Sequence, residues 1–286
     1  MKIKSFFLSM LSVIFAVVIF LLCKHSLESL PVFNENTSVT LPVLMYHSVL
    51  KDPQRTGKYT ITPKKFEEDL IYLKNNGYET VSLKQVIKYV YHNEPLPEKP
   101  ILLTFDDGMY NNKEYVLPLL EKHDATAVFA VVGSYTDEYT QSGVTNPAYS
   151  YLKWSDIEEI MDTERVEFAN HSYNLHNISA TRMGTAKNKN ENSLDYISLF
   201  HQDTQKMQSA FSTNCIFTPY AYIYPLGNFS KESEHVLKKL GFLTTFSCVE
   251  GINVLTQGDI DCLYLLKRYN RDGRPSTESF FNKLKL

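Results

Sequence analysis

Short apolar runs that alternate with helical patterns constrain the fold of this chain more than any other feature. The run ILLTF at 101–105 carries no charge, and further strand-like runs lie at 125–133, 166–172, 220–227, 242–249 and 262–270. Strands that are apolar throughout are typical of a parallel sheet covered on both faces. The alternation predicts an α/β fold, and about seven strands fit a (β/α) barrel better than a small open sheet.

Amphipathic segments separate these runs. In residues 63–77, Phe66, Leu70 and Leu73 recur at helical spacing, and Gly77 stands where a helix would end. Residues 80–92, 113–124 and 230–241 carry further helical patterns. Residues 179–193 are polar and irregular, which predicts an inserted surface loop. No second folded domain is needed.

The N-terminus predicts a membrane segment. Lys2 and Lys4 precede an uncharged run from Ser5 to Cys23, close to the length of about 20 residues that spans a bilayer. Basic residues ahead of the run favour a cytoplasmic N-terminus and an extracytoplasmic remainder. We expect an anchor at 1–23, a linker at 24–40 and a catalytic domain at 41–286. A cleaved signal peptide, with secretion, is the alternative.

Composition excludes one class of partner and leaves others open. The 286 residues carry a net charge of −3 and no basic block, so we expect no nucleic-acid binding. Cys215, Cys248 and Cys262 lack metal-type spacing and indicate small buried side chains.

Two adjacent acids follow the run at 101–105. Neighbours on a regular strand point to opposite faces, so Asp106 and Asp107 could share a pocket only where the strand ends. Gly108 permits a sharp turn there, and active sites of parallel α/β folds lie at the carboxyl ends of strands. A helix N-cap aspartate with an incidental neighbour is the alternative.

Two histidines follow another strand-like run. His171 and His176 are five residues apart, which does not place them on one helical face. They are either exposed loop residues or ligands that converge on a metal with an aspartate from another strand. Two histidines and one aspartate leave zinc an open position for a water, and the second aspartate could accept that water's proton. The pattern predicts metal-assisted hydrolysis.

These motifs carry a family resemblance. TFDDG at 104–108, HSYNLH at 171–176 and YPLG at 224–227 resemble the polysaccharide deacetylase family, the NodB-homology carbohydrate esterases. PVLMYHSV at 42–49 and residues 61–83 also resemble the start of that domain, and the likeness covers roughly 41–270. The five-residue histidine spacing looks most like the branch that deacetylates poly-β-1,6-N-acetylglucosamine.

The resemblance implies a distorted (β/α) barrel and roles for particular residues. Asp106 would be the general base, and Asp107, His171 and His176 would hold a divalent metal, most often Zn²⁺. Leu226 replaces the tyrosine of the family motif, and its backbone N–H would stabilise the oxyanion. The resemblance assigns no residue to protonate the leaving amine.

Other residues are predicted to contact substrate. They lie near strand ends or family motifs: His47, Asn112, Tyr224, Pro225 and Arg268. Trp154 could stack on a sugar, although core packing is favoured for it.

Three functions fit the sequence. The first is metal-dependent removal of N-acetyl groups from an extracellular polymer, poly-β-1,6-N-acetylglucosamine or a chain like peptidoglycan or chitin. The second is a weak or inactive deacetylase-like protein that binds glycan. The third is a glycoside hydrolase. It is disfavoured because its two carboxylates should stand about 5–10 Å apart on opposite sides of a bond, an arrangement that the adjacent residues Asp106 and Asp107 reach poorly.

Overall fold

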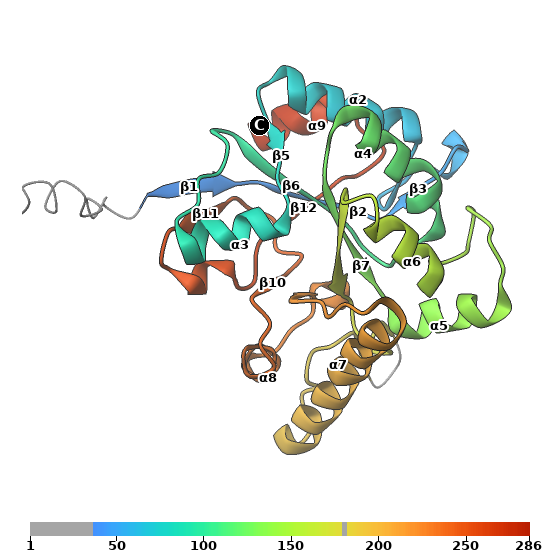
Figure 1. The fold of residues 1–286 in the computed structure, drawn as a ribbon, viewed down its shortest axis with the longest axis vertical. Coiled ribbons are helices and arrows are strands. Elements are labelled where there is room, and N and C mark those ends of the chain that lie inside the picture. Colours follow the sequence, from blue (N-terminus) through green and yellow to red (C-terminus); the bar gives the residue numbers. More distant parts are fainter. Residues whose placement is uncertain (1–36, 179–181) are drawn as a thin grey trace, which may run out of the picture. The chain divides into compact units, whose positions relative to one another are not determined.

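A parallel sheet forms the centre of the protein (Figure 1). The computed structural model describes residues 37–178 and 182–286, so the predicted anchor at 1–23 lies outside the described residues. In that part of the chain, no helix has the length and apolar character needed to cross a membrane. The strands of the chain are β1 Ser38–Leu41, β2 Val43–Tyr46, β3 Ser48–Val49, β4 Thr60–Ile61, β5 Glu79–Thr80, β6 Pro100–Phe105, β7 Ala127–Val131, β8 Val166–Asn170, β9 Ala221–Ile223, β10 Thr244–Phe246, β11 Asn253–Thr256 and β12 Tyr269–Asn270.

Seven of these strands follow one another in the order β10-β9-β8-β7-β6-β2-β12, and β5 pairs with β6 beside them. Every pair in this series is parallel, which confirms the predicted α/β class and strand number. The curved series resembles part of a barrel. Two short pairs lie outside it, β1 with β11 and β3 with β4.

One segment bridges the two ends of the series. Leu266 forms a bridge with Phe246 of β10, and the chain then runs on to pair Tyr269 and Asn270 with β2. We call Leu266–Asn270 the closing segment. Because side chains alternate along extended backbone, Leu266, Arg268 and Asn270 share one face of it.

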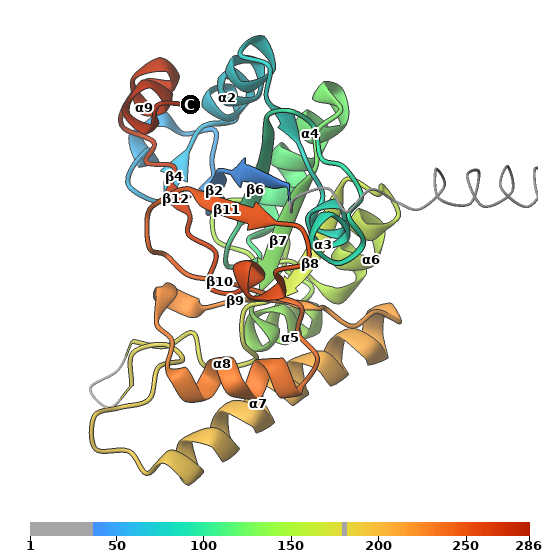
Figure 2. The ribbon, with the colours of Figure 1, turned by 90° about the vertical axis from the view of Figure 1, so that its left-hand side faces the viewer.

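Helices cover the outside of the sheet (Figures 1 and 2). The helices are α2 Pro63–Asn75, α3 Leu83–His92, α4 Leu117–His123, α5 Gly133–Ser142, α6 Trp154–Met161, α7 Ser193–Cys215, α8 Lys231–Lys239 and α9 Thr277–Leu284, with a π-helical turn at Asn112–Val116 before α4. The end predicted for α2 is confirmed. Tyr78 N–H donates to Leu73 O, and Gly77 has φ 78°, as in a Schellman turn.

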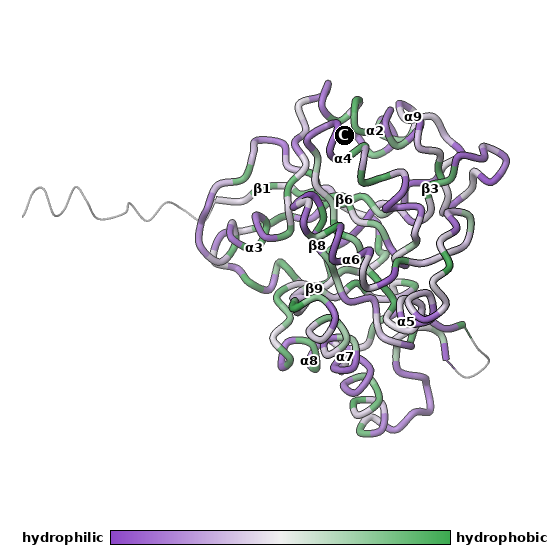
Figure 3. Tube along the Cα trace, turned by 45° about the vertical axis from the view of Figure 1, so that its right-hand side comes forward, coloured by the Kyte–Doolittle hydropathy of each residue, from purple (hydrophilic) through white to green (hydrophobic). Residues whose placement is uncertain are grey.

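Two apolar layers pack on the sheet, and Figure 3 shows apolar residues along its strands. Along β6, Ile101, Leu103 and Phe105 pack with the outer helices, whereas Leu102 belongs to a separate cluster. That second cluster also holds Val128, Ala169, Ile223 and Leu266, one from each of four other chain segments. We call the side of the sheet that carries this second cluster its inner face. Because side chains alternate along a strand, the residue two positions after each of these also lies on the inner face, nearer the carboxyl end of its strand.

The predicted boundaries need two corrections. The predicted linker at 24–40 runs too far, because Ser38–Leu41 is already strand β1 and pairs with β11. The pattern around His201 indicates a helix, but the bounds of the 23-residue helix α7 were not predicted, because its sequence mixes polar residues with apolar ones such as Phe200 and Phe211.

A buried ion pair fastens the C-terminal region. The Arg271 guanidinium donates two hydrogen bonds of 2.8 Å to the Asp69 carboxylate of α2. Thr277 of α9 donates to the same carboxylate at 2.7 Å, and Tyr46 of β2 donates at 3.2 Å. This pair connects three elements that are distant in the sequence.

Candidate active site and metal centre

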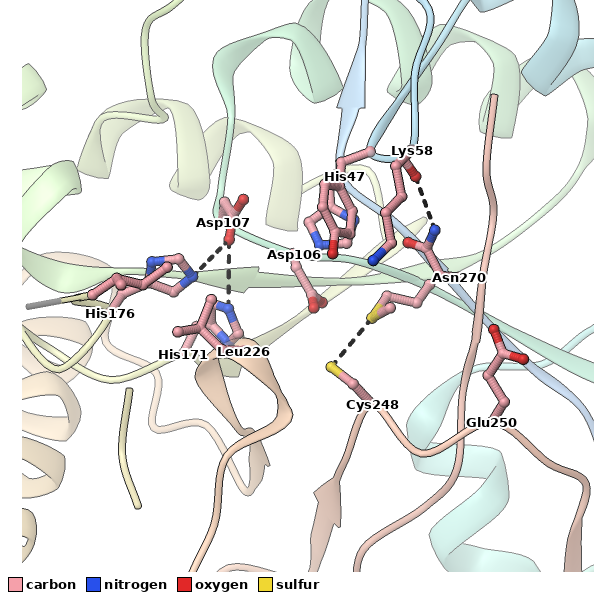
Figure 4. Close-up of a pocket in the computed structure, with 13 residues that line it drawn as sticks. His47, Lys58, Asp106, Asp107, His171, His176, Leu226, Cys248, Glu250 and Asn270 are labelled. Atoms are coloured by element: carbon pink, nitrogen blue, oxygen red, sulfur yellow. Dashed lines mark hydrogen bonds and ion pairs between the residues drawn. The ribbon is translucent and has the colours of Figure 1, made fainter. Parts of the chain in front are cut away.

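A pocket of about 460 Å³ opens where the parallel strands end (Figure 4). Its walls come from segments that follow β2, β6, β8, β9 and β10, together with β12 and the loop before β4. The lining residues are Met45, His47, Lys58, Tyr59, Asp106, Asp107, His171, His176, Ile178, Leu226, Cys248, Glu250 and Asn270.

Asp106 and Asp107 reach this pocket by different routes. Leu102, Thr104 and Asp106 lie on the same face of β6 and its continuation, so regular alternation turns Asp106 inward. Asp107 breaks the alternation with φ 75°, followed by Gly108 at φ 69°. A Cβ on Gly108 would lie 2.7 Å from Val131 Cγ1, so both space and backbone angle favour glycine here. The turn explains how adjacent acids share one pocket.

Asp107 lies beside both histidines. Its Oδ1 is 3.1 Å from His176 Nε2 and 3.5 Å from His171 Nε2. The three ligand atoms all lie within 4.8 Å of one another. Burial alone would raise the pKa of Asp107, but its contacts with the two histidines lower it well below its ordinary value.

The donor set fits a divalent cation. His171 Nδ1 is 2.7 Å from the Ile223 carbonyl oxygen, and this contact fixes the proton on Nδ1 and leaves Nε2 free as a ligand. Two imidazoles and a carboxylate are ligands that zinc and similar metals accept. The residues predicted as ligands are therefore brought together, with an outer partner that orients one of them.

Asp106 is held by a buried arginine. The Arg268 guanidinium donates to both Asp106 oxygens, at 2.7 and 2.9 Å, and neither side chain has more than 4% of its surface exposed. Arg268 also donates to Ser247 O at 2.8 Å and to Thr104 Oγ1 at 3.1 Å. Burial would raise the pKa of Asp106, but the charge of Arg268 outweighs it and lowers that pKa. Asp106 is thus ionised and fixed in orientation.

Comparison with known proteins identifies this arrangement. A family model described as Polysaccharide deacetylase matches residues 93–245, which include both aspartates, both histidines and Leu226. The chain belongs to the polysaccharide deacetylase family.

Several family members resemble it over most of its length. The poly-beta-1,6-N-acetyl-D-glucosamine N-deacetylase of Escherichia coli K12 is 27% identical over 235 residues, 76% of this chain but 35% of the relative. This chain thus spans about a third of that relative's length. The protein of the same name from Staphylococcus aureus NCTC 8325 is 20% identical, over 87% of this chain and 88% of the relative. A solved de-N-acetylase from Aggregatibacter actinomycetemcomitans aligns with TM-score 0.70 and 25% identity, over 85% of this chain and 99% of that one.

The sequence predicted that Arg268 contacts substrate, and the structure corrects this prediction. The arginine is fully buried and does not line the pocket, so it contacts Asp106 rather than the open pocket space. The closing segment supplies the arginine that pairs with Asp106. The sequence feature that could have indicated a buried, paired arginine is the single arginine in the largely apolar run CLYLLKRYN at 262–270.

Three further predicted contacts lie away from the pocket. Asn112 is fully buried in the π-helical turn. Tyr224 is buried among aromatic side chains, and its hydroxyl donates to Glu234 at 2.7 Å. Pro225 is also buried and does not line the pocket. Trp154 packs in the core against Phe211, as favoured.

His47 and Leu226 do line the pocket. His47 follows Met45 on the inner face of β2, and burial lowers its pKa, so the imidazole is neutral at physiological pH. Leu226 has φ 57° and Gly227 has φ 69°, and this double left-handed turn carries Leu226 to the pocket. Its N–H remains the predicted oxyanion donor.

The sequence did not single out several lining residues. They are Met45, Lys58, Tyr59, Ile178, Cys248, Glu250 and Asn270. Cys248 and Asn270 follow inward residues Phe246 and Arg268 by two positions, so strand alternation could have found them. Lys58 and Tyr59 come from a loop whose position depends on tertiary contacts.

Proposed function

We propose that this chain is a metal-dependent N-deacetylase that acts on poly-β-1,6-N-acetylglucosamine. The observation that carries the proposal is the convergence of Asp107, His171 and His176 beside an ionised Asp106 in one pocket. The names of the relatives support the substrate.

The chain's own residues would divide the reaction between them. A divalent cation held by Asp107, His171 and His176 would supply Lewis acidity for the acetyl carbonyl and lower the pKa of a water. Asp106 accepts the proton of the attacking water, and the Leu226 N–H hydrogen-bonds to the oxyanion that develops on the carbonyl oxygen of the acetyl group.

Asp106 also returns the proton. As the C–N bond breaks, the protonated Asp106 donates to the leaving nitrogen, so that acetic acid and a free amine result, and the acid then loses its proton to the amine or to solvent to give acetate. His47 is neutral and brings no proton of its own to this step. A carboxyl whose pKa is held low by Arg268 is a strong acid once protonated, which favours donation to a basic amine.

We further propose that the protein is anchored in the cell membrane through the uncharged run Ser5–Cys23, with its catalytic part outside the cytoplasm. Lys2 and Lys4 ahead of this run support that orientation. Release of the catalytic part after cleavage is the alternative, and the N-terminal sequence of the mature protein distinguishes the two.

Metal removal tests the proposed reaction. We expect chelator treatment to abolish acetate release from β-1,6-linked N-acetylglucosamine oligomers, and added Zn²⁺ or Co²⁺ to restore it. Acetate and chain length are measured together, with β-1,4-linked oligomers as the comparison. Acetate release that survives complete metal removal contradicts the proposal, and shortened chains would indicate a glycoside hydrolase instead. Glycan binding without acetate under added metal would indicate the inactive, glycan-binding alternative.

The pH dependence of the metal-free protein follows from the His176–Asp107 pair. Burial alone would lower the pKa of His176, but its hydrogen bond to Asp107 raises it above the ordinary 6.5, whereas the pKa of Asp107 lies below 3.8. The pair's stabilisation is therefore present above pH 3.8 and below pH 6.5, and is lost as pH rises through the folded pKa of His176.

Metal binding should show the opposite trend. Because a proton on His176 competes with the cation, we expect the Kd for Zn²⁺ to fall between pH 5.5 and 8, by up to about tenfold per pH unit below that pKa. Calorimetry measures the Kd, and thermal unfolding with chelator measures the metal-free stability. His176→Gln is the control that should remove most of both pH dependences. A Kd that is unchanged over this range contradicts the assignment of His176 as a ligand.

A further inference from the structure

The two histidines of the site are fixed in different ways. His171 directly follows β8, and its ring is oriented by the Ile223 carbonyl oxygen. His176 lies at the end of residues 172–176, which we call the histidine loop. Because this loop is neither helix nor strand, other parts of the chain must fix its backbone if His176 is to lie beside Asp107, as Figure 4 shows.

A carboxylate from helix α7 binds two successive amides of the histidine loop. Tyr173 N–H donates to Asp203 Oδ1 at 2.9 Å, and Asn174 N–H donates to Asp203 Oδ2 at 2.7 Å. Asp203 is only 9% exposed. A hydrogen bond to an ionised acceptor is shorter and stronger than one between neutral groups, and two parallel bonds also fix the direction of approach. Asp203 therefore sets the orientation of the loop ahead of His176.

Neutral groups hold other parts of the loop. The Ser172 carbonyl oxygen accepts from Gly133 N–H at 3.1 Å, at the start of α5. The Tyr173 carbonyl oxygen accepts from Ser134 N–H at 2.8 Å. Asn170 Oδ1 accepts from Ser172 N–H at 2.8 Å, where the backbone takes a left-handed φ of 69°. Among these partners of the loop, Asp203 is the one that carries a charge.

Helix α7 holds Asp203 firmly in place. Met207 and Phe211 follow Asp203 by four and eight positions, so they share its face of the helix, and both are buried in the core cluster of the outer helices. Asn170 Nδ2, at the end of β8, donates to Gln208 Oε1 at 3.3 Å. A carboxylate on a packed helix can fix the loop before any ligand binds, which reduces the entropy lost on binding.

We propose that Asp203 is a positioning residue for the metal centre, which holds the histidine loop so that His176 lies beside Asp107 and His171 before a cation binds. This inference rests on the proposed function, because it takes His176 to be a metal ligand. Asp203 does not line the pocket and acts through the two loop amides. Residues that orient a ligand from behind contribute about 10–100-fold to metal affinity.

The chain offers a matched carboxylate at the other end of β8. Glu167 accepts from the successive amides of Leu83 and Lys84 at the start of α3, the second at 3.0 Å. Buried amides need acceptors wherever they occur, so loss of either carboxylate should lower stability. Only loss of Asp203 should also change metal binding, because Glu167 lies at the amino end of the strand whose carboxyl end leads to His171.

Substitution of each carboxylate by its amide separates the two roles. Asp203→Asn keeps the shape of the side chain but turns one acceptor into a donor, which then faces a loop N–H. We expect the Kd for Zn²⁺, measured by calorimetry on the metal-free full chain at one fixed pH, to rise about 10–100-fold. Glu167→Gln should lower the unfolding temperature and leave this Kd unchanged. Equal rises in Kd for both variants would overturn the inference.

Two further readouts do not depend on stability. The visible absorption of bound Co²⁺ reports the arrangement of its ligands, so it should change in Asp203→Asn and not in Glu167→Gln. Amide hydrogen exchange of the metal-free wild type requires no variant to fold. We expect the Tyr173 and Asn174 amides to exchange slowly before metal is added. Fast exchange that becomes slow only with Zn²⁺ would overturn the inference, because the metal would then order the loop.

Acetate release separates this inference from the proposed function. If the wild type releases acetate while Asp203→Asn keeps the wild-type Kd and Co²⁺ spectrum, the positioning role is overturned and the deacetylase stands. If Zn²⁺ binding depends on Asp203 but the wild type releases no acetate, the reaction is overturned and the positioning role stands. A wild-type protein that binds no Zn²⁺ overturns both.

Discussion

Replacing Asp106 with asparagine is expected to lower kcat for acetate release by about 10²–10⁴-fold, the usual contribution of general acid–base catalysis. Asparagine occupies the same space but cannot accept the proton of the attacking water. The expected loss is at the upper end of that range, since Asp106 handles the proton in both halves of the proposed reaction. The measurement is acetate release with the metal-loaded enzyme.

Two controls accompany this variant. Zn²⁺ content should stay equal to that of the wild type, because Asp106 is not one of the three ligands. The variant also leaves the buried Arg268 charge without its carboxylate, so thermal unfolding must be measured beside kcat. Wild-type activity in a folded Asp106→Asn protein would refute the assignment of the base.

Two buried arginines that are three residues apart, Arg268 and Arg271, each pair with an aspartate. We expect substitution of one to lower kcat and substitution of the other to lower stability. We expect Arg271→Leu to lower the free energy of unfolding by about 3–5 kcal/mol, because it removes the only cation that pairs with the buried Asp69 carboxylate among the described residues. The Arg271 side chain does not line the pocket and pairs with Asp69 rather than with Asp106, so kcat of the protein that remains folded should be close to wild type. Urea denaturation and acetate release measure the two quantities.

The lysine substitutions form the matched comparison. Lysine keeps the charge but cannot make the two parallel hydrogen bonds that each arginine makes. Arg268→Lys should lower kcat by about 10–100-fold, the scale seen when a partner that orients a reacting group is lost. Arg271→Lys should lower stability without that loss of kcat. Equal effects of both substitutions on kcat would show that Arg268 has no orienting role of its own.

The sequence predicts those parts of the site that strand periodicity governs. Asp106, His171 and His47 each lie beyond the end of an apolar strand and turn inward by alternation. The parallel fold then brings these ends to one side of the sheet. The family resemblance supplied the roles, and the fold class followed from the apolar runs alone.

Strand periodicity could not predict contacts between segments that are distant in the sequence. Arg268 is 162 positions from Asp106 along the chain, and no local pattern indicates that the two side chains pair. Tyr224 and Pro225 were placed near substrate because of their motif, but the chain turns at Leu226, so the tyrosine ring packs into the aromatic cluster. Asn112 follows the aspartate motif in sequence, yet the π-helical turn buries it.

The closing segment also has a consequence for when the proposed activity can arise. Arg268 stands directly before β12, the last strand of the sheet, whereas its partner Asp106 follows β6, in the first half of the chain. During synthesis the three proposed metal ligands are all present once residue 176 has been added, but the proposed base Asp106 gains its guanidinium partner only after the chain has grown past residue 268. We therefore expect a nascent or truncated chain that ends before the closing segment to lack deacetylase activity. Catalytic competence would thus report that the whole domain has been made and has docked its final strand.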